Sequence, residues 1–174
     1  CSSDLNLVIG DSGRITAANT GVAQFADVPM TFGLIETIAF GDGGSDSITT
    51  GTGNDIVLGG HLDDTIIVSG GNNIVLGDDG QIDYVRVERG ATTGVQGADT
   101  DAADIDLIES LSTTSAGGVD NITANGGNDI ILGGRHGDTI NAGDGSNLVI
   151  GDSGRVAAAN PGVAQFADVP MTFG

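Results

Sequence analysis

A period of nine residues constrains this chain more than any other feature of its sequence. Two blocks of four nonapeptides occupy 41–76 and 115–150, and the chain opens on the equivalent of a fourth nonapeptide, CSSDLNLVI. Position six of every repeat is Asp or Asn, and position eight is Ile or Val. Chance rarely keeps two different chemistries in phase over nine repeats, so the nonapeptide is the structural unit.

The period predicts how the backbone folds. Six turn residues followed by a three-residue strand reverse the chain every nine residues, so two repeats make one coil. Alternate strand residues face opposite sides, which points position eight inward and positions seven and nine outward. Glycines in the turns supply positive φ and close backbone approach. We therefore expect an all-β fold, a parallel β-roll or β-solenoid with a narrow aliphatic core and longer strand-containing inserts.

Composition and charge agree with thin β-layers and limit the partners. The 174 residues include 31 Gly, no Trp and one Tyr, so the aromatic side chains of ordinary cores are scarce. The formal net charge is -19, with five arginines and no lysine. Such a chain is a poor partner for nucleic acid or for an anionic membrane surface. No apolar run reaches the roughly 18 residues of a membrane span. Bound cations are expected to offset the self-repulsion.

A second, longer repeat organises the chain. Residues 6–33 return at 147–174 with three differences, an offset of 141 residues. We expect a window on a longer tandem array, with neighbouring copies of the repeat as possible partners. The predicted segments are the end of a nonapeptide block (1–14), an insert (15–40), a block (41–81), an insert (82–114), a block (115–155) and the start of the next insert (156–174).

The position-six side chains are the candidate metal ligands. They are Asp46, Asp55, Asp64, Asn73, Asp120, Asp129, Asp138 and Asn147. Tight turns also leave backbone carbonyls pointing between coils. Hard oxygen ligands at flexible spacing suit Ca²⁺, whereas Mg²⁺ demands stricter octahedral geometry. Transition metals would require His or Cys. Several Ca²⁺ ions are therefore the expected cofactor.

The repeats resemble a known calcium-binding family. TGTGNDIVL, ANGGNDIIL and GGHLDDTII are similar to the GGxGxDxUx nonapeptide of RTX (hemolysin-type) proteins, over roughly half the chain. In that family one Ca²⁺ lies between turns on the same side, which implies ligands from repeats n and n+2. The implied pairs are Asp46 with Asp64, Asp55 with Asn73, Asp120 with Asp138, and Asp129 with Asn147.

Some positions depart from the family pattern. The third repeats carry Leu62 and His136 where position four is normally Gly, which puts their turn geometry in question. The neutral Asn73 and Asn147 predict weaker sites. His61, like His136, is interpreted as a solvated turn residue.

Each nonapeptide block leaves through an exit turn, GDSG, GDDG or GDSG, whose acids are Asp11, Asp78 and Asp152. Two interpretations are open for them. They close the last site by pairing with Asp64 or Asp138 of the coil before, or they only form Asx-turns.

The even repeats predict an apolar outer face on one sheet. Its outward residues are Leu7, Ile9, Ile56, Leu58, Ile74, Leu76, Ile130, Leu132, Leu148 and Ile150. A patch of this size normally marks an interface. We favour coverage by the inserts, for example by Phe25, Val28, Met30 and Phe32, over coverage by a neighbouring chain. A third alternative is that the inserts form wider coils that extend the solenoid.

The favoured function is a calcium-stabilised structural segment of a large extracellular, secreted or cell-surface protein, such as an adhesin or matrix fibre. The main alternative is the calcium-dependent carrier region of an exported RTX enzyme or toxin. No G-x-S-x-G, H-E-x-x-H or Cys-His arrangement occurs, so we expect that the segment is not an enzyme. Binding of ice or another flat ligand is less favoured, because the Thr and Asn row of TGTGND is not continued in the neighbouring repeats.

Overall fold

The structure is a computed structural model of the chain, and it describes residues 5–17, 32–86, 105–112 and 117–157. All regular elements in these ranges are strands, which confirms the all-β prediction. The strands form two parallel sheets and one antiparallel sheet, so the fold as a whole is mixed. Among the residues described, no helix has the length and apolarity to cross a membrane.

The chain divides into two compact units. Unit 1 comprises 1–13, 37–80 and 110–154, and therefore contains the nonapeptide blocks. Unit 2 comprises 14–36, 81–109 and 155–174, and therefore contains most of the inserts. Each unit is built from three stretches of sequence, so the chain leaves and re-enters both of them twice.

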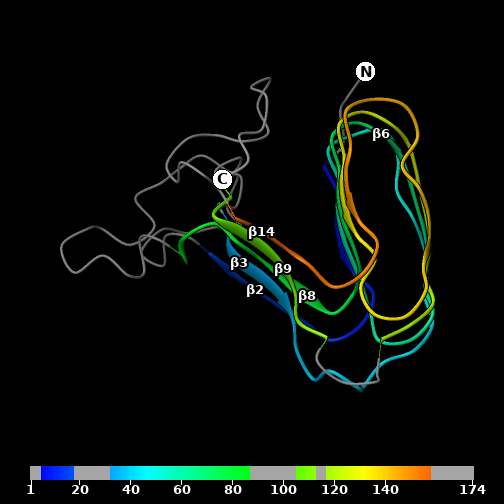
Figure 1. The fold of residues 1–174 in the computed structure, drawn as a ribbon. Coiled ribbons are helices and arrows are strands. Elements are labelled where there is room, and N and C mark those ends of the chain that lie inside the picture. Colours follow the sequence, from blue (N-terminus) through cyan, green and yellow to red (C-terminus); the bar gives the residue numbers. More distant parts are fainter. Residues whose placement is uncertain (1–4, 18–31, 87–104, 113–116, 158–174) are drawn as a thin grey trace. The chain divides into compact units, whose positions relative to one another are not determined.

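The two parallel sheets of unit 1 take alternate repeats. The even repeats supply a five-stranded sheet: β1 (Leu7–Ile9), β5 (Ile56–Gly60), β7 (Ile74–Asp78), β11 (Ile130–Leu132) and β13 (Leu148–Ile150). The odd repeats supply a four-stranded sheet: β4 (Ser47–Thr49), β6 (Thr65–Gly70), β10 (Asn121–Gly126) and β12 (Thr139–Asn141). Successive coils overlie one another in Figure 1.

The register of these sheets keeps equivalent positions of the repeats side by side. Val57 pairs with Val75, and Ile66 pairs with Ile48, each across 18 residues. The second block continues the stack without a break, because Ile122 pairs with Ile66 across 56 residues. After the insert, the chain therefore re-enters the stack one coil further on.

Position eight forms the core of unit 1, as the period predicts. The inward residues make one aliphatic cluster that includes Ile48, Val57, Ile66, Val75, Ile122 and Ile131. Five of these six side chains are fully buried. Val68 and Ala124 of the odd-repeat sheet belong to the same cluster, and no aromatic ring does, in line with the composition.

The outward apolar residues of the even repeats are also buried on the three central strands, β5, β7 and β11. On the two edge strands, β1 and β13, the equivalent side chains are half-buried. Which residues cover this face stays a prediction. Of the insert residues proposed to cover it, Phe25, Val28 and Met30 lie outside the described residues.

Unit 2 is a single five-stranded antiparallel sheet. Its order is β14 (Arg155–Ala157), β9 (Leu107–Ser110), β8 (Gly80–Asp83), β3 (Phe32–Thr37) and β2 (Gly13–Ala17). The LIET and LIES stretches of the inserts lie in β3 and β9. Ile35 of β3, Ile82 of β8 and Ile108 of β9 are buried at the centre of the sheet. An ion pair joins Arg14 to Glu36. For the described residues, this antiparallel sheet contradicts the alternative that the inserts form wider coils that extend the solenoid.

Candidate metal sites

Position-six residues of the odd repeats form a ladder along one edge of unit 1. The Asp46 amide donates to Asp64 Oδ1 at 2.8 Å. The Asp64 amide donates to Asp120 Oδ1 at 2.8 Å, and the Asp120 amide donates to Asp138 Oδ1 at 2.9 Å. Every rung is an aspartate. We call this row, together with the exit aspartates Asp11, Asp78 and Asp152, the acidic edge.

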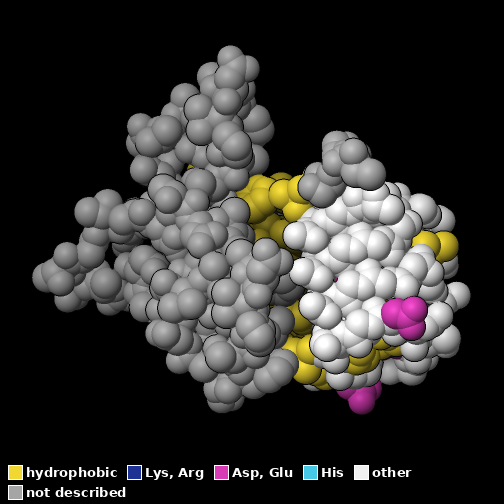
Figure 2. All heavy atoms as spheres, turned by 90° about the horizontal axis from the view of Figure 1, so that it is seen from above, with side chains coloured by type: hydrophobic (Ala, Val, Ile, Leu, Met, Phe, Trp, Pro, Cys, Tyr) yellow, Lys and Arg dark blue, Asp and Glu magenta, His cyan; other side chains and the backbone are white. Residues whose placement is uncertain are grey.

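Position-six residues of the even repeats form a second ladder on the opposite edge. Amides of Asn6 and Asn73 donate to Asp55 Oδ1 and Asp129 Oδ1, each at 2.9 Å. In turn, Asp55 donates to Asn73 and Asp129 donates to Asn147, also at 2.9 Å. Asn and Asp alternate, so we call this row the amide edge. Seen from above in Figure 2, it shows mainly uncharged polar and backbone atoms.

The ladders bring together all four pairs that the family resemblance implies. They also contain three contacts across the inserts that the nonapeptide period does not give: Asn6 with Asp55, Asp64 with Asp120, and Asn73 with Asp129. The equal register of the two blocks is the only signal for them in the sequence.

Each ladder aspartate keeps a second oxygen without a partner. Oδ2 is buried and makes no hydrogen bond in Asp46, Asp55, Asp64, Asp120, Asp129 and Asp138. Oδ1 accepts a ladder amide in all of these residues except Asp46, which stands at the end of its row. A buried carboxylate oxygen without a donor is costly, because it has lost its water and gained no replacement. The same unpartnered oxygen in six equivalent places fits a repeated cation site rather than six packing errors.

Glycines on the acidic edge leave space beside these oxygens. A Cβ added to Gly59 would collide with Asp64 Oδ2 and with the carbonyl oxygen of Gly77. Gly77 lies in the same way against Asp120 Oδ2 and the Gly133 carbonyl. Gly10 and Gly133 repeat the arrangement one step before and one step after. Each coil thus presents a carboxylate and a carbonyl oxygen around a position that only glycine can occupy.

The exit aspartates fasten one block to the next. Asp11 accepts hydrogen bonds from the amides of Gly44, at 3.0 Å, and His61. Asp78 accepts the equivalent amides of the second block, from Gly118, at 2.8 Å, and Arg135. These partners are 33 to 57 residues away, so neither aspartate serves only its own turn.

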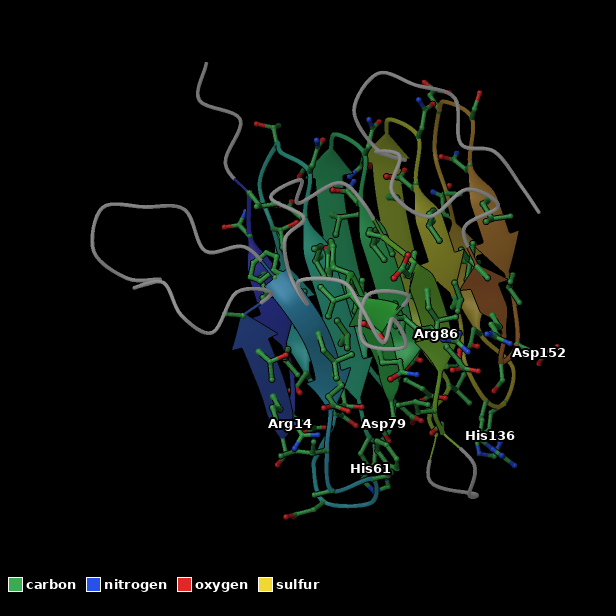
Figure 3. All side chains as sticks on the ribbon, turned by 90° about the vertical axis from the view of Figure 1, so that its left-hand side faces the viewer. Arg14, His61, Asp79, Arg86, His136 and Asp152 are labelled. Atoms are coloured by element: carbon green, nitrogen blue, oxygen red, sulfur yellow. The ribbon has the colours of Figure 1, made fainter. Side chains whose placement is uncertain are left out.

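The exit aspartates also lie close to the coil before. The charge of Asp78 contributes to raising the Asp64 pKa, and that of Asp152 contributes to raising the Asp138 pKa. Asp78 and Asp152 are thus near the partners expected for closing ligands. Figure 3 shows Asp152, Asp79, His61 and His136 along this edge.

Burial and mutual repulsion perturb the carboxyl groups of the acidic edge. Burial first, then the charges of Asp46, Asp11 and Asp78, raise the pKa of Asp64 to about 7. Burial, then Asp78, Asp64 and Asp138, raise the pKa of Asp120 to about 8. On the amide edge, burial alone raises the pKa of Asp129, and hydrogen bonds from Asn73 oppose the rise. Crowding of like charge is therefore a property of the acidic edge.

The third repeats accommodate their unusual residues by adopting the glycine conformation. Leu62 and His136 both have a φ of 73°, the left-handed region that is unfavourable for a bulky side chain. His136 is exposed, as expected, but His61 is half-buried and its Nδ1 atom is buried without a partner. The neighbouring Asp63 accepts the Val119 amide at 2.8 Å.

Asp79 is a buried acid that the sequence reasoning missed. It is 2% exposed, and its pKa is raised by burial and by the Asp11 charge. A hydrogen bond with Thr37 and the charge of His61 act in the opposite direction and lower the Asp79 pKa. The available signal was the exit GDDG, which has Asp where the other two exits have Ser12 and Ser153.

These donor sets fit calcium. Among the described residues, no three His, Cys, Asp or Glu side chains converge on a single point, so carboxylates are spaced one per step along each edge. A cation there would be held by Oδ2 atoms and backbone carbonyls, which are the hard oxygen ligands that Ca²⁺ accepts at variable number. The chain thus has the features of a calcium-binding repeat protein.

Comparison with known proteins supports this class. The model of the RTX calcium-binding nonapeptide repeat, which describes four copies, matches residues 38–61, 62–81 and 115–149. The chain therefore carries RTX calcium-binding repeats, as its nonapeptides predict. No curated protein matches the chain. No solved structure matches it either.

Proposed function

We propose that the chain is a calcium-stabilised structural segment of a large extracellular or cell-surface repeat protein, of the adhesin or matrix-fibre kind. Unit 1 is a β-roll in which calcium ions lie between successive coils, and the segment has no catalytic role. Extracellular calcium is millimolar, and weak extracellular sites are tuned to about 10⁻⁴ to 10⁻³ M. The ion is then abundant where the segment works.

One observation carries this proposal: six position-six aspartates each leave a buried Oδ2 atom without a hydrogen bond. The ladder supplies an amide donor to Oδ1 in all of them except Asp46, and no hydrogen-bond donor reaches the second oxygen in any of the six. A divalent cation between coils supplies the missing charge to Oδ2. Folding and calcium binding are therefore coupled, as in other domains whose metal ligands are assembled only by folding.

The acidic edge has the stronger demand for calcium. Its four ladder aspartates stack directly on each other, and Asp78 adds its charge to both Asp64 and Asp120. On the amide edge, the side-chain amide of Asn73 donates to Asp129 Oδ1 at 2.8 Å, and Asn6 does the same for Asp55. These side-chain amides stabilise the negative charge of the two carboxylates and so provide part of the stabilisation that a cation would provide. We therefore assign the tighter calcium sites to the acidic edge.

The proposal is tested by following folding against calcium. Circular dichroism and thermal unfolding are measured in excess chelator, in millimolar Mg²⁺ and in millimolar Ca²⁺. We expect the β signal and the cooperative transition to develop in Ca²⁺ and to be weak in chelator and in Mg²⁺. At a calcium concentration of 100 times Kd, each site adds about 2.7 kcal/mol to the free energy of unfolding.

Variants place the ions on the two edges. Asp64→Asn removes one charge from the acidic edge, and Asp55→Asn is the matched change on the amide edge. Both keep a side-chain oxygen for the ladder amide. The calcium concentration at the folding midpoint should rise about tenfold or more for Asp64→Asn and by less for Asp55→Asn. A chain that is fully folded in chelator would refute the calcium mechanism, and equal shifts would refute the assignment to one edge.

A further inference from the structure

The two edge strands of the five-stranded sheet have the same sequence. β1 and β13 both read LVI, within segments that are identical at 25 of 28 positions between 6–33 and 147–174. β1 pairs with β5, which follows it in the chain, whereas β13 pairs with β11, which precedes it. The structure therefore shows one copy of the segment paired with the strand that follows it and the other copy paired with the strand that precedes it.

The first copy of the segment shows what its following side binds. Asn6 donates its backbone and side-chain amides to Asp55 Oδ1, at 2.9 and 2.8 Å. The Gly10 amide donates to the Leu58 carbonyl at 2.9 Å. Asp11 accepts the amides of Gly44 and His61. All of these partners belong to the block that follows.

The second copy has the same groups in place but turned to open space. A Cβ added to Gly151 meets no heavy atom within 4 Å, whereas its equivalent Gly10 lies against Asp46 Oδ2 and the Gly59 carbonyl. Asn147, the equivalent of Asn6, turns its side-chain amide back to the Ala142 carbonyl at 2.9 Å. The row of buried position-eight residues also ends here, because Val149, the last of them, is 42% exposed.

We propose that residues 147–154 form a docking segment for a second copy of the repeat. The strand Ile56–Gly60 of that copy pairs with β13 in parallel, in the register that it has with β1. Leu148, Val149 and Ile150 then lie beside Ile56, Val57 and Leu58 of the second copy, and Asp152 accepts its Gly44 and His61 amides. This goes beyond calcium binding, because the occupant is another copy of the repeat.

Two physical arguments support this occupant. An unpaired strand edge is a template for a further strand, and repeat proteins need their open ends covered by a neighbouring repeat or a cap. The sequence identity makes the second copy complementary to the segment, since β1 already shows each contact satisfied. The sheet gains four strands per copy, so at a strand spacing of about 4.8 Å each repeat advances the stack by about 19 Å.

In separate chains, β1 of one molecule and β13 of another compete for the same strand. The full chain should therefore stay monomeric, because β1 is tethered and occupies β5 first. The variant Val8→Asp weakens the packing of β1 and leaves β13 intact. We expect it to associate head to tail in calcium buffer, with a mass that rises with concentration in sedimentation velocity. Such an interface joins different surfaces and does not close, so higher oligomers follow dimers.

Matched controls decide whether β13 is the docking strand. Val149→Asp alone, and Val8→Asp with Val149→Asp, should both remain monomeric while retaining their β signal. Association of the double variant would overturn the proposal, as would a folded, monomeric Val8→Asp.

A tandem chain gives a second measurement if Val8→Asp does not fold. Residues 34–174 are appended to the full chain, Cys1 is replaced by Ser, and cysteines are placed at Leu148 and at the second copy of Ile56. We expect oxidation to form a disulfide as completely as in a single chain with Leu7→Cys and Ile56→Cys, whose strands are paired. A disulfide in the single chain only would overturn the proposed register.

Discussion

Asp120 connects the two nonapeptide blocks, and replacing it with Asn separates its hydrogen bond from its charge. Its Oδ1 accepts the Asp64 amide at 2.8 Å, and an asparagine oxygen retains this bond. Its charge is unfavourable in the calcium-free fold, since its pKa is raised from 3.8 to about 8. At about 1.4 kcal/mol per unit this corresponds to about 6 kcal/mol, of which relaxation and solvent at the edge leave roughly half or less. Asp120→Asn should therefore stabilise the calcium-free chain at pH 8 by about 2 to 3 kcal/mol.

Calcium should reverse the sign of this effect. With the ion bound, Asp120→Asn lacks a charged ligand, and a tenfold loss of affinity costs about 1.4 kcal/mol. The assay is urea unfolding followed by circular dichroism at pH 8, once in excess chelator and once in millimolar Ca²⁺. Asp129→Asn is the matched control, because it keeps both Asn73 hydrogen bonds and burial alone raises the pKa of Asp129. Its gain in chelator should be smaller.

Three results would contradict this prediction for Asp120→Asn. A loss of stability for Asp120→Asn in chelator would show that charge crowding does not limit the calcium-free fold. Equal gains for Asp120→Asn and Asp129→Asn would show that the two edges do not differ. A gain that persists unchanged in Ca²⁺ would show that Asp120 is not a ligand.

Three further predictions concern turns and pH. Leu62→Gly should raise the free energy of unfolding by about 1 kcal/mol in urea, because Leu62 has a φ of 73°, and an unchanged midpoint would contradict this. Gly134→Ala should lower it by about 2 kcal/mol, because Gly134 has a φ of 121° and a Cβ there meets the Asp78 carboxylate; a neutral result would exclude that contact. In chelator, stability should fall as pH rises. The raised pKa values of Asp64 and Asp120 give a contribution that is complete below pH 3.8 and is lost through about 7 and 8, so a flat profile of Tm against pH would contradict them.

The parts of the fold that repeat every nine residues could be predicted from the sequence. Position eight forms the core, and alternate repeats form the two parallel sheets, because side-chain direction follows directly from strand periodicity. Asp46 and Asp64 stand on adjacent coils for the same reason.

The remaining features depend on where the chain re-enters the stack, which local spacing does not contain. The contact of Asp64 with Asp120 spans 56 residues and exists only because the insert returns one coil further on. The long-range bonds of Asp11 and Asp78 and the burial of Asp79 have the same origin. The left-handed backbone of Leu62 could not be predicted either, because propensity rules assign that conformation to glycine. Here the neighbouring coils impose it on a leucine.

The contrast between the two edges follows from a small difference in sequence. Both ladders use the same backbone geometry, with an amide of one coil donating to Oδ1 of the next. On the amide edge an asparagine separates Asp55 from Asp129, so no two carboxylates are adjacent and Asn73 adds a side-chain donor. On the acidic edge Asp64 and Asp120 are adjacent, and the exit aspartate Asp78 acts on both. Asparagine side-chain amides therefore offset part of the negative charge on the amide edge, whereas the acidic edge has only backbone amides. We expect the stacking of coils to depend on calcium mainly through the acidic edge.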